Sequence, residues 1–253
     1  MQAIPHSVEL SKDHPRYRSL IVRERLAELN RAGIVSTTGL IAHGRGEAFN
    51  YLLGERTTPD ALLAEKVAVA YLLEAENPVI SVNGNVAALC PEEVIALSEG
   101  IPAKIEVNLF HSVEGRMEKV VSHMEAAGAK MVLGRNLDAR LKGISSDRAL
   151  CAKEGIFSAD VVLVPLEDGD RAEALVRAGK IVLAVDLNPL SRTAGAATVT
   201  IVDEVTRALP NMIGAVRGLR EDGPERKRLI SSFDNGMNLK RIVQAICDHL
   251  QIN

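Results

Sequence analysis

The stretch ADVVLVPLEDGDRAEALVRAGKIVLAVDLN, residues 159–188, predicts the architecture of this chain. Two runs within it, VVLV at 161–164 and IVLAV at 181–185, are apolar at successive positions, which is typical of strands buried on both faces. Between them, residues 170–179 have a helical pattern that ends at a glycine. A strand, a helix and a second strand in succession indicate two parallel strands joined by a crossover helix.

The same alternation extends through most of the chain after Pro78. Short β-branched or aliphatic runs occur as PVISV, KIEV, MVL and TVTIV, and helical patterns such as PEEVIALSEG and GRMEKVVSHMEAAGA separate them. We therefore predict an α/β fold with about six strands in a mostly parallel sheet that has helices on both faces.

The flanking segments complete a predicted single α/β domain over residues 1–253. A loosely held arm at 1–15 precedes an N-terminal helix at about 16–31, and a C-terminal tail at 224–253 forms one or two helices interrupted at DNG. The passage GLIAHGRGEAFNYLLGERTTPD, residues 39–60, is rich in glycine and polar residues but too well mixed to be a linker.

Composition narrows the classes of function. The 253 residues are 47% hydrophobic but only 3% aromatic, without tryptophan, and the net charge is −3. Neither a basic surface nor aromatic platforms for nucleic acid are expected. Three separated cysteines without a CxxC pattern fit a reducing compartment, the cytoplasm. The polar N-terminus is not expected to be a signal peptide, and no apolar run approaches the roughly 20 residues needed to cross a membrane.

Polar clusters follow three of the predicted strands, where ligands bind in open α/β sheets. In the first, Asn83, Gly84 and Asn85 close the strand PVISV. A glycine lets a ligand approach the backbone, and a helix N-terminus attracts anions. A plain strand-to-helix turn would use the same residues.

The second cluster is LEDGDR, in which Glu167, Asp168 and Asp170 precede Arg171. One acid suffices to cap the following helix, so the others are candidates for Mg²⁺ or for an ammonium group.

The third cluster is VDLNPLSRT. Asp186 and Asn188 end the strand IVLAV, and Arg192 and Thr193 follow. A carboxylate can accept hydrogen bonds from ribose hydroxyls and an arginine can bind phosphate oxygens, whereas a solvated loop is the alternative.

The fourth cluster, HGRGEAF, lies in the glycine-rich passage. His43 and Arg45 are each followed by glycine, which we interpret as placing both side chains on an approachable loop. Arg45 suits a phosphate or carboxylate, and His43 could donate to an oxyanion. Glu47 could pair with Arg45 or cap the following turn. His111, after NLF, could also face a site.

Several enzyme classes lack their motifs in this sequence. No GxxxxGK[ST] phosphate loop, complete GxGxxG fingerprint or GxSxG nucleophile elbow is present.

Taken together, the segments GLIAHGRGEAFNYLLGE, PVISVNGNVAAL, EVNLF, VDLNPLSRTA, TIVD and FDNG resemble the archaeal 4-phosphopantoate–β-alanine ligases, also called phosphopantothenate synthetases. The likeness runs from His14 to Gly236. It implies a Rossmann-like fold, a homodimer and ATP-dependent amide formation in coenzyme A synthesis. The departures are Asn50, where an acid is expected, and Met237, where a basic residue is common.

The resemblance also implies which residues contact the substrates. The ATP contacts fall on Arg23, Arg45, Asp186, Leu187, Asn188, Arg192, Thr193, Glu204 and Val205. Our catalytic candidates are Arg45, His43 and Asp168, and our candidates for the other substrates are Asn83, Gly84, Asn85, Asp170 and Arg171.

The reaction implied joins 4-phosphopantoate to β-alanine through an acyl-adenylate, with ATP and Mg²⁺, and releases AMP and diphosphate. Two alternatives remain at this point. A pantoate kinase on the same scaffold would release ADP, and a non-catalytic nucleotide sensor would bind ATP without turnover.

Overall fold

The protein is built around a six-stranded, wholly parallel sheet with strand order β3-β2-β1-β6-β7-β8. This computed structural model describes residues 11–14, 16–109, 115–144, 147–166 and 168–252. The strands are β1 (Pro78–Val82), β2 (Lys104–Val107), β3 (Val132–Leu133), β6 (Val161–Pro165), β7 (Ile181–Val185) and β8 (Val199–Ile201). The predicted α/β sheet is confirmed, and its strand order is that of a Rossmann fold.

Alternate residues of the central strands enter two different hydrophobic cores. In β6, Val161 and Leu163 pack into one core, whereas Val162 and Val164 pack into the other. The run VVLV is apolar throughout because both faces of its strand are covered.

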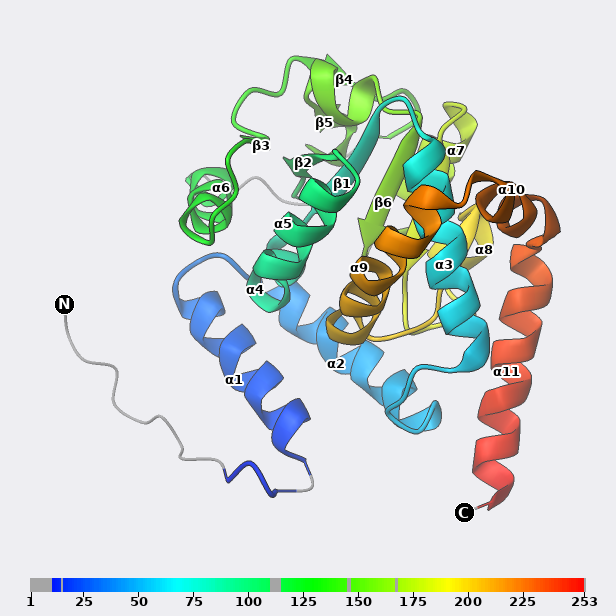
Figure 1. Cartoon of the computed structure of the whole chain (residues 1–253). Helices are drawn as coiled ribbons and strands as arrows, with labels where there is room; N and C mark the ends of the chain where they lie inside the picture. Colours follow the sequence, from blue (N-terminus) through cyan, green and yellow to red (C-terminus); the bar gives the residue numbers. More distant parts are fainter. Residues whose placement is uncertain (1–10, 15, 110–114, 145–146, 167, 253) are drawn as a thin grey trace.

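Helices cover both faces of the sheet (Figure 1). The first core includes residues of α3 (Pro59–Glu74), α4 (Gly84–Leu89), α5 (Pro91–Gly100), α6 (Arg116–Ala126), α9 (Val205–Glu221) and α10 (Gly223–Ser232). The second core is closed by α7 (Gly169–Arg177), by α8 (Arg192–Ala196) and by residues around a small ribbon, β4 (Ala139–Arg140) and β5 (Leu150–Cys151). Short helices η1 (Asp147–Ala149) and η2 (Lys153–Phe157) flank β5.

The ends of several helices follow from their sequence. Thr58 caps α3, its Oγ1 accepting from the Ala61 amide at 3.1 Å, and Pro59 occupies the first turn. Gly33, with a φ of 80°, follows α1 (Tyr17–Arg31) and takes the left-handed conformation that is common just beyond a helix end. The predicted tail is two helices, α10 and α11 (Asn235–Ile252), separated at the DNG segment.

The predicted exposed loop at HGRG, residues 43–46, is wrong, because these residues belong to helix α2 (Thr37–Leu52). Ser36 caps this helix by accepting from the Gly39 amide at 3.1 Å. At its other end, Phe49 and Leu53 pack in a small core with residues of β7–α8, β8–α9 and α11, namely Leu187, Val202 and Ile242. The stabilisation from capping and packing outweighs the roughly 1 kcal/mol that each glycine costs in a helix. Glycine content alone therefore does not predict whether the segment is helical.

Helices α1 and α2 lie across the edge of the sheet toward which β6 points (Figure 1). They contact each other and α4, so they form a roof over the carboxyl ends of the strands. Within the described residues, none of the helices is both long and apolar enough to cross a membrane.

Replacing two glycines of α2 by alanine should change the stability of the protein in opposite directions. A methyl group on Gly44 would meet nothing within 4 Å, whereas one on Gly39 would overlap the Asn85 side-chain oxygen. We expect Gly44→Ala to raise the free energy of unfolding by about 0.5–1 kcal/mol, from helix propensity. Gly39→Ala should lower it by about 1–3 kcal/mol. Urea unfolding of both variants measures this, and equal effects would contradict the described packing of α2.

Candidate functional site

A cavity of about 1160 Å³ opens at the carboxyl ends of the strands, beneath α1 and α2. It lies where the strand order reverses, because β1 leads toward β2 on one side and β6 leads toward β7 on the other. Open α/β sheets bind ligands at such a switch point. Most of the predicted site residues line this cavity: His43, Arg45, Asn83, Gly84, Asn85, Asp168, Asp186, Leu187, Asn188, Arg192, Thr193, Glu204 and Val205.

The side chain of Asn83 connects the two strands at the switch point. Its amide nitrogen donates to the carbonyls of Pro165 and Leu166, at 3.1 and 3.0 Å, at the end of β6. Its amide oxygen accepts from the backbone of Asn85 and Val86, which begin α4. Leu166 has a φ of 57°, an uncommon conformation for a residue with a side chain, and it lines the cavity. Asn83, which follows β1, therefore links the end of β6 to the start of α4 at the base of the cavity.

The next residues attach the roof to this floor. Asn85 donates to the Gly39 carbonyl of α2 at 2.9 Å. A methyl group on Gly84 would overlap the Ile34 carbonyl and come within 2.7 Å of the Arg116 guanidinium. Gly84 thus allows the backbone after α1 and the Arg116 side chain to approach α4 closely.

The segment after β7 forms a preformed polar loop. Asp186 accepts from the Asn188 amide at 2.9 Å and from the Ser191 hydroxyl at 2.5 Å, and Asn188 in turn accepts from the Leu190 amide at 2.9 Å. Successive turns of this kind fix the loop without a ligand. Burial raises the pKa of Asp186, and the nearby charge of Arg45 opposes that rise.

Two polar side chains on α2 face the cavity with different surroundings. Burial lowers the pKa of His43, so the imidazole is neutral at pH 7. Burial alone would raise the pKa of Glu47, but hydrogen bonds from Arg23 and Tyr51 lower it below its ordinary value. Glu47 pairs with Arg23 at 2.8 Å and not with Arg45. The predicted ATP contact Arg23 lies outside the cavity wall, where it holds Glu47 on α2.

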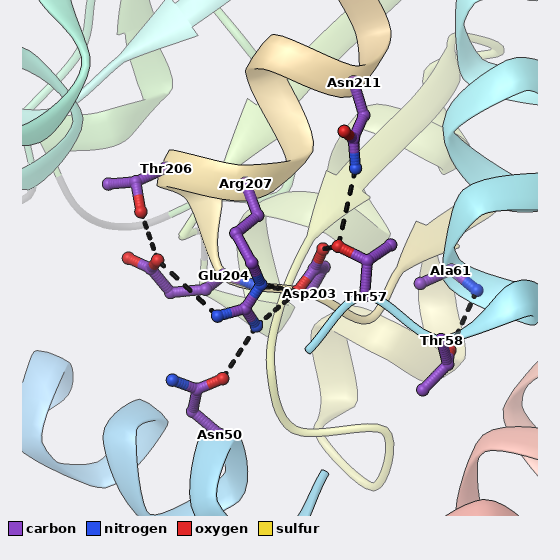
Figure 2. A network of polar contacts seen from close by, with 9 residues as sticks. All are labelled: Asn50, Thr57, Thr58, Ala61, Asp203, Glu204, Thr206, Arg207 and Asn211. Atoms are coloured by element: carbon purple, nitrogen blue, oxygen red, sulfur yellow. Dashed lines mark hydrogen bonds and ion pairs between the residues drawn. The ribbon is translucent and has the colours of Figure 1, made fainter. Parts of the chain in front are cut away.

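A network around Asp203 supports the far end of the cavity (Figure 2). The buried Asp203 carboxylate accepts from the Arg207 guanidinium at 2.5 and 2.9 Å and from the Thr57 hydroxyl at 2.5 Å. Arg207 also donates to Asn50 of α2 at 2.7 Å, and its Nη1 lies 4.0 Å from Glu204. The network joins the start of α9, the start of α3 and α2, so it holds the roof to the end of β8.

The two acids of the LEDGDR cluster that the structure describes, Asp168 and Asp170, each lie beside an arginine. Asp168 lies 3.4 Å from Arg148, and Asp170 lies 2.7 Å from Arg192 and outside the cavity wall. Glu167 and His111 are not among the described residues. Across the described residues, no three acidic, histidine or cysteine side chains converge to hold a metal.

Arg171 lies beneath the cavity and does not line it. Its side chain is fully buried in the second core region, where it donates to Ser81 of β1 at 3.3 Å. Arg171 and Asp170 are adjacent in sequence but project in different directions from the first turn of α7.

Sequence reasoning missed five arginines that line the cavity: Arg18, Arg25, Arg116, Arg148 and Arg207. Arg207 had a sequence signal, because it lies four residues after Asp203 across a helix start. Arg116 and Arg148 had none. Each reaches the site by contacts between segments that are far apart in the chain.

Comparisons with known proteins identify the family of this chain. The model of the phosphopantothenate/pantothenate synthetase family matches residues 60–249. This chain belongs to that family. A protein of Methanosarcina mazei named 4-phosphopantoate–β-alanine ligase is 52% identical over 252 residues, which cover 99% of this chain and 97% of the relative. Proteins of the same name from Thermococcus onnurineus and Methanospirillum hungatei are 48% and 54% identical, covering 96% and 84% of this chain and 94% and 87% of theirs.

Glu65 of α3 is a buried acid beside the network around Asp203. It is completely buried, and burial together with the charge of Asp203 raises its pKa to about 8. The folded protein therefore retains a proton that the unfolded chain releases near pH 4.3. The stability that this proton confers is complete below the unfolded pKa and is lost as the pH rises through about 8.

We predict that Glu65→Gln removes this pH dependence, because the amide is neutral at every pH. Relative to the parent, the melting temperature of the variant should rise progressively between pH 5 and pH 9. Scanning calorimetry measures the difference, with the exposed Glu221→Gln as control. Parallel curves for the parent and Glu65→Gln would show that Glu65 is not held protonated.

Proposed function

We propose that this chain is an ATP-dependent ligase that joins 4-phosphopantoate to β-alanine and releases AMP and diphosphate. The observation that carries the proposal is the gathering of the family's nucleotide motifs around one cavity at the switch point of the sheet. Relatives that cover almost the whole chain bear the name of this activity.

A carboxylate is a poor electrophile and must be activated before an amine can attack it. In our proposal, one carboxylate oxygen of 4-phosphopantoate attacks the α-phosphorus of ATP and diphosphate leaves with the bonding electron pair. The uncharged amine of β-alanine then attacks the acyl carbon, AMP leaves, and the amine loses a proton. The protein contributes mainly by positioning the reactants and by stabilising charge.

The cavity suggests a role for each candidate residue. The nucleotide would be held at the ends of β7 and β8 by Asp186, Asn188, Arg192, Thr193, Glu204 and Val205. Arg45 would stabilise charge that grows on the phosphates, and the neutral His43 could donate to them or accept a proton. Asp168, half exposed after β6, would attract the ammonium group of β-alanine. Mg²⁺ would accompany the triphosphate, as is usual for this ion.

We also propose that the enzyme is a homodimer, as the resemblance implies, and that it is cytoplasmic, as its separated cysteines suggest. Light scattering of the purified protein measures its mass in solution, and a monomer mass at the concentration used for activity would contradict the dimer.

Product analysis tests the function. With ATP, Mg²⁺, 4-phosphopantoate and β-alanine, we expect AMP and phosphopantothenate in equal amounts. ADP as the product would favour a kinase, and tight ATP binding without turnover would favour a sensor.

Arg45→Ala should lower kcat about a hundredfold, since loss of a charge-assisted contact made in the transition state costs roughly 3 kcal/mol. Arg45→Lys should recover only part of the rate, because an ammonium group cannot form the bidentate contact. The Arg45 side chain is exposed, so the fold should survive in both variants. The exposed Arg56→Ala, just beyond α2, is the matched control. Near-normal kcat in a folded Arg45→Ala protein would remove this residue from the active site.

A further inference from the structure

The segment FDNG, residues 233–236, lies outside the wall of the cavity and leads into the C-terminal helix α11. Within it, the Asp234 carboxylate accepts from the Met237 amide at 2.7 Å, so Asp234 caps this helix. Asn235 follows as the first residue of α11, and its side chain is half-buried. The asparagine therefore projects from a helix end that is itself fixed.

The first turn of α11 covers the outer side of β8, which is the last strand of the sheet. The Thr200 amide of β8 donates to Asn235 Oδ1 at 2.8 Å, and the Thr200 carbonyl accepts from Asn238 Nδ2 at 2.9 Å. A neighbouring strand would form hydrogen bonds with the same backbone groups. Two side chains of α11 therefore take the place of a further strand at this edge of the sheet.

Asn235 also binds α8. Its Nδ2 donates to the carbonyls of Ala194 and Ala197, at 3.0 and 3.1 Å, in the last turn and at the C-terminal end of that helix. The Thr200 hydroxyl donates to the same Ala194 carbonyl at 2.8 Å. The two polar atoms of one amide group thus join α8 to β8.

Helix α8 has only five residues, so contacts with other elements determine its position. Just before it begins, the Ser191 hydroxyl donates to Asp186 at 2.5 Å. In its first turn, α7 comes so close that a methyl group on Gly169 would overlap Arg192 Cβ. At its other end, Asn235 binds its carbonyls. Ser191, Asp186 and Gly169 line the cavity, whereas Asn235 holds α8 from outside it.

The two elements that Asn235 joins carry part of the candidate nucleotide site. Arg192 and Thr193 of α8 line the cavity, and so do Glu204 and Val205, which follow β8. Both pairs can contact one nucleotide only if the spacing between α8 and the end of β8 is correct. Groups that are already held at that spacing lose little entropy when a ligand binds.

We propose that Asn235 is a positioning residue for ATP, because it joins α8 to β8 and so sets the spacing of the two segments that bind the nucleotide. The proposal rests on the proposed function for the identity of this ligand. Since Asn235 lies outside the cavity wall, its replacement should change the affinity for ATP and not the chemistry of the reaction.

Calorimetric titration of Asn235→Ala and Asn235→Asp with ATP and Mg²⁺ tests the proposal. The alanine variant loses the bonds to both elements, whereas the aspartate can still accept from the Thr200 amide but cannot donate to α8. We expect the Kd for ATP to rise roughly 10- to 100-fold in both, since a displacement of about 1 Å has effects of this size. The KM for ATP should rise in parallel, while the KM for β-alanine changes less than about twofold.

Asn238→Ala is the matched control, because this asparagine lies one turn further along α11 and binds the same residue of β8. Among the described residues, its amide binds Thr200 and neither carbonyl of α8. Pairing with β7 still holds β8 in this variant. Asn238 is completely buried, so its loss should lower the melting temperature at least as much as Asn235→Ala does. The Kd for ATP should nevertheless stay within about twofold of the parent value.

Two results would overturn the proposal. An equal rise of the Kd for ATP in Asn235→Ala and Asn238→Ala would assign Asn235 a part in stability only. An unchanged Kd in Asn235→Asp, with a native circular dichroism spectrum, would show that the bonds to α8 do not position the nucleotide. The aspartate variant, which keeps its bond to β8, gives the comparison if the alanine variant does not fold.

The same measurements separate this proposal from the proposed function. A parent protein that binds ATP but forms no product would contradict the ligase reaction, and the variants would still test the positioning by Asn235. A parent that does not bind ATP would overturn both. Normal product formation by the parent, with equal ATP affinity in the parent and both Asn235 variants, would overturn the positioning alone.

Discussion

The hydrogen bonds of one side chain, Asn83, determine how the cavity is built. At the switch point the paired strands β1 and β6 lie side by side, and the connections that follow them run in opposite directions. Asn83 spans this point, because its amide nitrogen binds the end of β6 while its amide oxygen caps α4. An aspartate in its place could accept the α4 amides but could not donate to the β6 carbonyls.

Helices α1 and α2 close the cavity that the ends of the strands begin to form. Helices α1 and α2, from the N-terminal part of the chain, cover the cavity. Three contacts attach α2 to its neighbours: Asn85 of α4 binds Gly39, Arg207 of α9 binds Asn50, and Arg23 of α1 binds Glu47. Charged groups that are buried beneath these helices, such as Asp186, interact more strongly than they would in water. In the proposed reaction, cover of this kind would also limit the hydrolysis of an acyl-adenylate.

The sequence predicted the sheet well because its strands are continuous apolar runs, such as VVLV at 161–164 and IVLAV at 181–185, and buried parallel strands need that pattern. It failed at α2, where the glycines of HGRG suggested a loop and where capping by Ser36 and packing of Phe49 favour a helix. Arg116 could not be predicted for a different reason. Its partner, the Ile34 carbonyl, is 82 residues away in the chain, so only the folded topology brings the two together.

In the proposed reaction, one cavity places the carboxylate of the acid against the α-phosphorus of ATP. The most direct measurement uses 4-phosphopantoate labelled with ¹⁸O in its carboxylate, with mass spectrometry of the products. Formation of an acyl-adenylate transfers one labelled oxygen to AMP and leaves the other in the amide. We predict singly labelled AMP in an amount equal to the phosphopantothenate formed. Unlabelled AMP, or label in inorganic phosphate together with ADP, would contradict the account.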